Sequence, residues 1–238
     1  MATDTTAVGT KPYDPYAHLR QVEAVFRKRT GKEEGKRKQR LREMSSLTRV
    51  GIVTFPVMES LPMENILQKV YETTTALLKT EHPGYMLSHS LKLDLETLKL
   101  PYEKEIMTVV SPIVQYHFTQ RPLQLTRCVL VQFGEEHDAQ LDIHKDDADV
   151  TINLTLEVSE DHAGNEVVFH GKQTLLSHKK TNAADREDAG RGGKTLKTHV
   201  KQWQGWCYIH YGKHVHQTMK IKNGKRRSLI LWYKEVLQ

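Results

Sequence analysis

Cysteine is scarce in this sequence, and long apolar runs are missing from it. Only Cys128 and Cys207 occur among 238 residues, and neither belongs to a C-x-x-C motif. This excludes a disulfide scaffold and a cysteine-based zinc site, and we expect two buried, reduced thiols. No stretch approaches the ~20 apolar residues of a membrane span, and the first residues lack the apolar segment of a secretory signal. We therefore expect an intracellular protein, cytoplasmic or nuclear, with no membrane partner.

A charge excess is also absent from most of the chain. The formal net charge is +6, but residues 27–42 alone hold nine Lys/Arg and two Glu, a net of +7. The remainder is therefore close to neutral. Such a local basic segment can contact nucleic acid or an acidic partner, or carry a nuclear address. A solvated basic helix without a partner is the other interpretation.

The first half of the chain offers few signals. Residues 1–45 are polar and basic, and we expect a disordered N-terminal extension. Residues 46–125 predict helical support with one or more edge strands. Within them we expect a strand at 49–57 that ends at Pro56, a helix over 60–79, and a second helix over 100–116 that is broken near Pro112.

From residue 126 to 238 the pattern changes to short apolar runs separated by Gly, Asn, Asp and charged residues. Such runs without helical patterns between them predict a β-sandwich or barrel, which forms one fold unit with 46–125. The alternation in VTINLTLE predicts a strand with one face in water. The interval 171–203 is polar and predicts a long loop, functional or disordered. The runs are 127–133, 150–158, 165–170, 205–211 and 227–234.

A histidine and an aspartate stand two residues apart just before the 150–158 run. On extended backbone, His144 and Asp146 leave the same face, so an imidazole nitrogen and a carboxylate oxygen can reach one metal ion. This H-x-D pair alone is weak evidence, because a chain with 13 His produces such pairs by chance.

The C-terminal run YGKHVHQTMKIKNGKRRSLILWYK is more specific. His216 precedes Arg226 by ten residues, and Ser228 shares a strand face with that arginine. The Asn223-Gly224 pair between them predicts a tight turn joining two antiparallel strands. A guanidinium beside a hydroxyl suits a carboxylate, and two histidines with one carboxylate leave three positions of an octahedral iron open on one face.

These residues carry a family resemblance. H-x-D, a distal His and R-x-S ten residues later are similar to the signature of the Fe(II)/2-oxoglutarate oxygenase superfamily. The segments VLVQFGEEHDAQLDIHKDDADVTINLTLE, GNEVVF and GKHVHQTMKIKNGKRRSLILWY resemble its prolyl and lysyl hydroxylase-like branch. The resemblance covers about residues 126–235.

The resemblance implies a mainly β fold with supporting helices and a double-stranded β-helix (jelly-roll) core. It implies a dioxygenase that hydroxylates a C–H bond using Fe(II), 2-oxoglutarate and O2. His144, Asp146 and His216 would be the catalytic metal ligands. Arg226 and Ser228 would bind the 2-oxoglutarate carboxylate.

The chain departs from the family pattern at two positions. Phe133 stands where many relatives carry a tyrosine that helps to hold this carboxylate, so Ser228 is our first choice for the missing donor. Gly164-Asn165 replaces the usual Gly-Gly. His214 also fits the distal strand, but His216 alone has the family's offsets to Gly212 and Arg226. We expect His210 and His214 to line the site or face solvent.

The substrate is open at this stage. Similarity to the hydroxylase branch weakly favours a protein side chain. The basic segment 27–42 would suit a nucleic-acid or nucleotide oxygenase instead, although the nucleic-acid dealkylating branch carries a second arginine where Trp232 stands. A non-catalytic metal-binding β-barrel is the remaining alternative, but it would have no reason to keep the R-x-S clamp.

Overall fold

The computed structural model describes residues 46–57, 65, 68–69, 72–73, 86–87, 90–91, 103–134, 140–178 and 196–236. The N-terminal extension predicted over 1–45 and its basic segment 27–42 lie outside these residues. Within 60–79, residues 65, 68–69 and 72–73 are helical. In the described part of the chain, no helix is long and apolar enough to cross a membrane.

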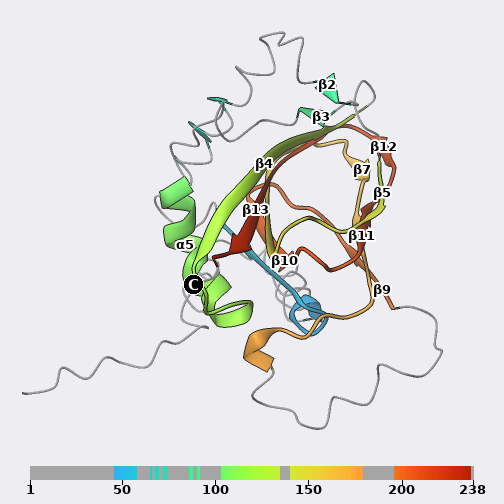
Figure 1. The fold of residues 1–238 in the computed structure, drawn as a ribbon. Coiled ribbons are helices and arrows are strands. Elements are labelled where there is room, and N and C mark those ends of the chain that lie inside the picture. The colour runs from blue at the N-terminus through green and yellow to red at the C-terminus, as the bar shows by residue number, and fades with distance from the viewer. Residues whose placement is uncertain are drawn as a thin grey trace, which may run out of the picture.

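Two antiparallel sheets build the fold, and β4 and β13 curve along one side of it (Figure 1). The larger sheet has the order β1-β10-β6-β13-β4, so strands distant in sequence are neighbours. Its β-branched runs supply the hydrogen-bonded strands that the sequence predicts. The strands are β1 (Ile52–Pro56), β10 (Trp206–Tyr211), β6 (Val150–Val158), β13 (Arg226–Glu235) and β4 (Leu123–Phe133).

The smaller sheet has the order β5-β11-β8-β9 and lies across the barrel from β4 (Figure 1). Its strands are β5 (Leu141–His144), β11 (His216–Thr218), β8 (Val167–His170) and β9 (Lys197–Val200). The described residues also contain two pairs of short strands. These are β12 (Ile221–Asn223) with β7 (Ala163–Gly164) and β2 (Met86–Leu87) with β3 (Ser90–Leu91). This is the double-stranded β-helix that the resemblance implies.

Helix α5 (Glu103–His117) runs along the outside of the large sheet (Figure 1). The prediction that this helix breaks near Pro112 is wrong, because Pro112 lies inside it. A proline in a helix interior costs about 3 kcal/mol. The apolar face of α5 compensates, since Ile106, Val110 and Val114 are buried in the main core. Its last residue contacts η1 (Leu176–His178) through His117 Nδ1 and Ser177 Oγ, 2.9 Å apart.

The hairpin predicted at Asn223-Gly224 does not form. The chain does turn at Gly224, whose φ of +72° favours glycine. However, β12 pairs with β7, whereas β13 pairs with β4 and β6 in the other sheet. A Cβ on Gly224 would also collide with Ser159 Oγ. The turn therefore carries the chain from one sheet to the other, which a local turn signal cannot distinguish from a hairpin.

Two further predictions need correction. Residues 171–203 are not all loop, because β9 at 197–200 pairs with β8. Its short, polar sequence KTHV gives no strand signal by itself. The polar face of β6 is not in water, since Thr151 and Thr155 are each 1% exposed. That face instead lies in the barrel interior, where Thr151 and Asn153 line a cavity.

Candidate metal and co-substrate site

His144, Asp146 and His216 come together in space. His144 ends β5, His216 begins β11, and these two residues are paired in the sheet. One ligand atom from each of the three side chains lies within 4.8 Å of the others. Nε2 of His144 is 3.6 Å from Asp146 Oδ1, and Nε2 of His216 is 3.9 Å from Asp146 Oδ2. The three side chains therefore converge as the motif predicts, and their role as metal ligands stays a prediction.

Backbone carbonyls fix the orientation of both imidazoles. Nδ1 of His144 lies 2.6 Å from the carbonyl oxygen of Asp142, and Nδ1 of His216 lies 2.8 Å from that of His214. A carbonyl can only accept, so each Nδ1 carries the proton and each Nε2 keeps its lone pair. This is the tautomer that a metal-binding histidine needs.

Asp146 is held from two sides. Thr151 Oγ1 donates a 2.7 Å hydrogen bond to its Oδ2, and its backbone N–H donates to the Gly212 carbonyl at 3.0 Å. Gly212 must be glycine here, because a Cβ would collide with the carbonyl of Ala148. The glycine four residues before His216 thus packs directly against the loop that carries Asp146.

The three side chains open onto a cavity of about 440 Å³ inside the barrel. Residues that are paired across neighbouring strands form rows along the cavity wall. The row beside Asp146 consists of His210, Thr151, Trp232 and Arg127. The next row contains Asn153 and Ile230. Ser228 and then Arg226 follow along β13 toward the other end. One continuous cavity therefore contains the predicted metal ligands and the predicted anion clamp.

Arg226 and Ser228 are each 1% exposed. Nε and Nη1 of Arg226 and Oγ of Ser228 are buried and have no hydrogen-bond partner among the described residues. Burial lowers the pKa of Arg226 to about 9, so the guanidinium still carries its charge at neutral pH. A buried charge with several unsatisfied donors beside one cavity suits an anionic ligand with more than one acceptor oxygen.

Phe133 stands where the resembled oxygenase family often carries a tyrosine, and it is paired with Arg226 in the sheet. Its ring centroid lies 4.6 Å from the Arg226 guanidinium carbon, within cation–π range. The phenyl ring stabilises the charge but donates no hydrogen bond. Ser228 thus remains the hydroxyl nearest to Arg226 along the strand, and its part in co-substrate binding stays a prediction.

Burial favours the neutral forms of His216 and His210. Burial is the main cause that lowers the pKa of His216, partly opposed by the Asp146 carboxylate. Burial, followed by the neighbouring His216, also lowers the pKa of His210 well below its usual range. Neutral imidazoles are the form that binds a metal ion.

The donor set fits iron. Two imidazole nitrogens from the paired strands β5 and β11 and one carboxylate oxygen from the loop after β5 match a site that holds a divalent ion and leaves positions for other ligands. Asn165 stands where the resembled family has its second glycine, and its backbone conformation is compatible with that position. It adopts φ +57°, a left-handed conformation that asparagine tolerates, and its Nδ2 donates to the Met219 carbonyl at 3.2 Å.

Among the described residues, the other histidines have no ring nitrogen within 4 Å of the Asp146 carboxylate, with one exception. His214 is fully buried, and its Nε2 lies 3.4 Å from the Gly171 carbonyl. His199 pairs with Glu166 at the surface. The exception is His210, whose Nε2 lies 3.9 Å from Asp146 Oδ2. Sequence spacing could not place His210 or Thr151 here, because both reach Asp146 only through the pairing of β10 with β6.

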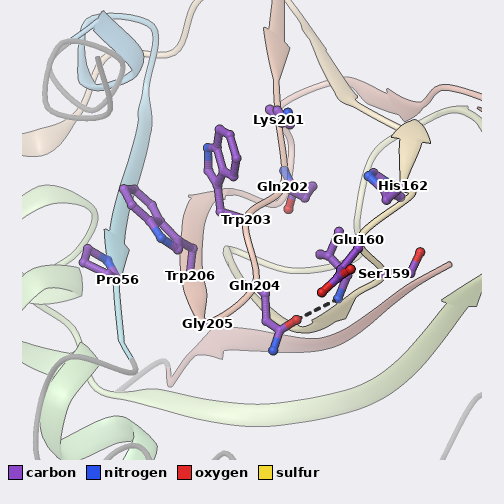
Figure 2. A pocket seen from close by; sticks show the side chains of 11 residues that line it. Pro56, Ser159, Glu160, His162, Lys201, Gln202, Trp203, Gln204, Gly205 and Trp206 are labelled. Atoms are coloured by element: carbon purple, nitrogen blue, oxygen red, sulfur yellow. Dashed lines mark hydrogen bonds between the residues drawn. The ribbon is translucent and has the colours of Figure 1, made fainter. Parts of the chain in front are cut away.

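A second cavity of about 350 Å³ opens where β10 begins (Figure 2). Trp203, Trp206 and His162 contribute to its wall. Gln202 lines both cavities. The pKa of His162 is lowered by burial and then by the charges of Arg226 and Lys201. None of the predicted metal ligands lines this second cavity.

The fold and the site together define a class: a double-stranded β-helix with a two-histidine, one-carboxylate cluster and a buried arginine in one cavity. No protein-family model matches the sequence. The 2-oxoglutarate and iron-dependent oxygenase domain-containing protein ICU11 of Arabidopsis thaliana is 25% identical over 173 residues, 71% of this chain and 40% of that protein. The oxygenase domain-containing protein 2 of Xenopus tropicalis is 21% identical over 196 residues, 81% of this chain and 51% of that protein.

A solved structure, an oxidoreductase of the 2OG-Fe(II) oxygenase family from Burkholderia pseudomallei, superposes with a TM-score of 0.52 at 16% identity. It covers 80% of this chain and 87% of that one. The protein is therefore a homologue of 2-oxoglutarate and iron-dependent oxygenase domain proteins and has the fold of the 2OG-Fe(II) oxygenases. The chain spans about half the length of the curated relatives that it matches.

Proposed function

We propose that this protein is an Fe(II)- and 2-oxoglutarate-dependent dioxygenase that hydroxylates a C–H bond of its substrate. One observation carries the proposal. The cluster of His144, Asp146 and His216 shares its cavity with Arg226 and Ser228, whose buried Nε, Nη1 and Oγ atoms have no hydrogen-bond partner among the described residues. A structural metal site would leave those buried donors unexplained, whereas a dicarboxylate bound to the ion satisfies them.

Each residue has a part in this chemistry. His144, Asp146 and His216 would hold the ion, and the Arg226 fork with Ser228 would bind the distal carboxylate of 2-oxoglutarate. When bound, iron with 2-oxoglutarate and O2 would place one oxygen atom in the substrate C–H bond and the other in succinate, with release of CO2.

The cavity wall would keep the reaction dry. Val129, Val131 and Ile230 line the space between the triad and Arg226. Apolar walls strengthen the pairing of the guanidinium with a carboxylate and exclude water from the reacting atoms.

The test combines binding and turnover. We expect the wild-type protein to bind one Fe(II) and one 2-oxoglutarate without oxygen, and to release succinate when oxygen is admitted. His144→Ala should abolish metal binding while the protein stays folded, because that side chain is partly exposed and lies at a strand end. His199→Ala is the matched control on the surface. Metal binding without 2-oxoglutarate binding would favour a non-catalytic barrel.

We also propose that the substrate is a protein side chain. Similarity to the prolyl and lysyl hydroxylase-like branch supports this, as does Trp232 at the position where the nucleic-acid dealkylating branch carries arginine. Peptide pools and oligonucleotides should be incubated separately under ¹⁸O2 and searched by mass spectrometry for products that gain one labelled oxygen. Label in oligonucleotides, lost when residues 27–42 are deleted, would favour the nucleic-acid alternative.

A further inference from the structure

A third imidazole faces the predicted metal site. His210 lies on β10 and is 4% exposed. Its ring centroid is 4.9 Å from that of His216. Its Nε2 lies 3.9 Å from Asp146 Oδ2, the same separation that His216 Nε2 has from that oxygen.

His210 has its tautomer fixed in the same way as the two predicted ligands. Its Nδ1 lies 2.9 Å from the carbonyl oxygen of Tyr211, which can only accept a hydrogen bond. Nδ1 therefore carries the proton, and Nε2 points its lone pair into the cavity that His210 lines. A second proton on the ring would place a positive charge beside a divalent cation, so the neutral form is favoured.

His210 is nevertheless unlike the two predicted ligands. The group whose ligand atoms all lie within 4.8 Å of one another contains His144, Asp146 and His216 but not His210. One ion can therefore bridge the first three side chains without moving the fourth. His210 therefore lies outside the group of predicted metal ligands.

The remaining contact joins two acceptors. Nε2 of His210 and Oδ2 of Asp146 both carry lone pairs, and 3.9 Å is too long for a direct hydrogen bond. A polar contact of this length can be bridged by a water molecule, which donates one O–H to each acceptor. Thr151 Oγ1 already donates to the same Oδ2 at 2.7 Å.

We propose that His210 is a positioning residue of the metal centre, whose Nε2 accepts a hydrogen bond from a water molecule shared with Asp146. This inference rests on the proposed metal-ligand set. Together with Thr151, the water would fix the plane of the Asp146 carboxylate, so that one oxygen stays directed at the ion. Outer-layer partners of this kind typically change metal affinity by about 10- to 100-fold.

The test uses Mn(II) as a stable substitute for Fe(II). Its affinity and stoichiometry are measured by calorimetry, and its hydration by electron–nuclear double resonance in deuterated water. We expect His210→Phe to bind one Mn(II) per chain with about 10-fold weaker affinity and an altered water signal. His210→Gln should recover most of both, because its amide oxygen can reach the position of Nε2 and accept the same bond.

His214→Phe is the matched control. His214 is equally buried, and both rings pack on Phe169, with centroids 4.9 Å away for His214 and 5.0 Å for His210. However, Nε2 of His214 faces the Gly171 carbonyl. The His214→Phe variant should bind Mn(II) with wild-type affinity and water signal. The inference is overturned if His210→Phe matches the wild type, or if it loses Mn(II) as completely as His144→Ala does while folded. Failure of the wild type to bind Mn(II) would instead overturn the proposed function.

Discussion

The guanidinium carbon of Arg226 lies 4.6 Å from the ring centroid of Phe133. The two residues are paired across β13 and β4, so the sheet itself holds ring and charge together. The oxygenase family that the sequence resembles often carries a tyrosine at this position, and the resemblance implies that its hydroxyl helps to bind the co-substrate carboxylate. This protein therefore keeps the aromatic support for the arginine and omits the hydroxyl.

Phe133→Tyr should restore the omitted donor. Phe133 is buried and lines the cavity beside Arg226, so a new hydroxyl has an anion within reach once 2-oxoglutarate is bound. One added hydrogen bond contributes about 1 kcal/mol, which corresponds to about fivefold tighter 2-oxoglutarate binding in anaerobic calorimetry. Weaker binding would mean that the ring edge points away from the carboxylate.

Arg226→Lys should weaken 2-oxoglutarate binding by about 10- to 100-fold, because one ammonium cannot form two parallel hydrogen bonds to a carboxylate. The affinity for Mn(II) should stay close to the wild-type value. Arg227→Lys is the matched control, since Arg227 pairs with Glu157 and Gln132 and does not line the cavity. Equal losses in both variants would show that a general change in the strand is responsible.

Much of the large sheet was predictable from sequence. Runs of aliphatic, aromatic and β-branched residues mark β6, β10 and β13 to within one residue, because such side chains favour a buried strand. The R-x-S spacing likewise places Arg226 and Ser228 on one face of β13. The H-x-D spacing brings Asp146 beside His144, although Asp146 lies just after the end of β5 and not on the strand. These signals are local, so one sequence suffices to find them.

The features that the sequence did not predict depend on strand pairings between residues far apart in the chain. β9 is short and polar and exists because β8 offers it an edge. The polar residues of β6 look solvated in sequence but face a cavity, which only the second sheet creates. His210 reaches Asp146 through the register of β10 with β6. Long-range register therefore decides what a polar residue contacts.

Gly212→Ala should weaken metal binding as well as the fold. The added methyl group would collide with the Ala148 carbonyl, and the Gly212 carbonyl accepts the Asp146 N–H. We expect a loss of about 1–3 kcal/mol in the free energy of unfolding and at least about 10-fold weaker Mn(II) binding.

Gly171→Ala is the control for Gly212→Ala. Gly171 has φ +78° and open space around its Cβ position, so alanine should cost about 1–2 kcal/mol through backbone conformation alone. Its Mn(II) affinity should match that of the wild type. If the two glycine variants lose metal affinity equally, the contact between Gly212 and the Asp146 loop is not the cause.

The stability of the metal-free protein should depend on His214. Burial lowers the pKa of His214 to about 4, with smaller contributions from His216 and His170. An unfolded chain restores the usual value near 6.5, so between pH 6.5 and 4 the unfolded state binds a proton that the folded state excludes. The free energy of unfolding must therefore fall as the pH is lowered through this window.

His214→Gln removes the group that binds this proton. The free energy of unfolding of the variant should fall less steeply with pH than that of the wild type, by up to about 1.4 kcal/mol per pH unit. Urea unfolding in EDTA measures both proteins, and above pH 7.5 their difference should be constant. An unchanged slope below pH 6.5 would mean that His214 takes up its proton in the folded protein.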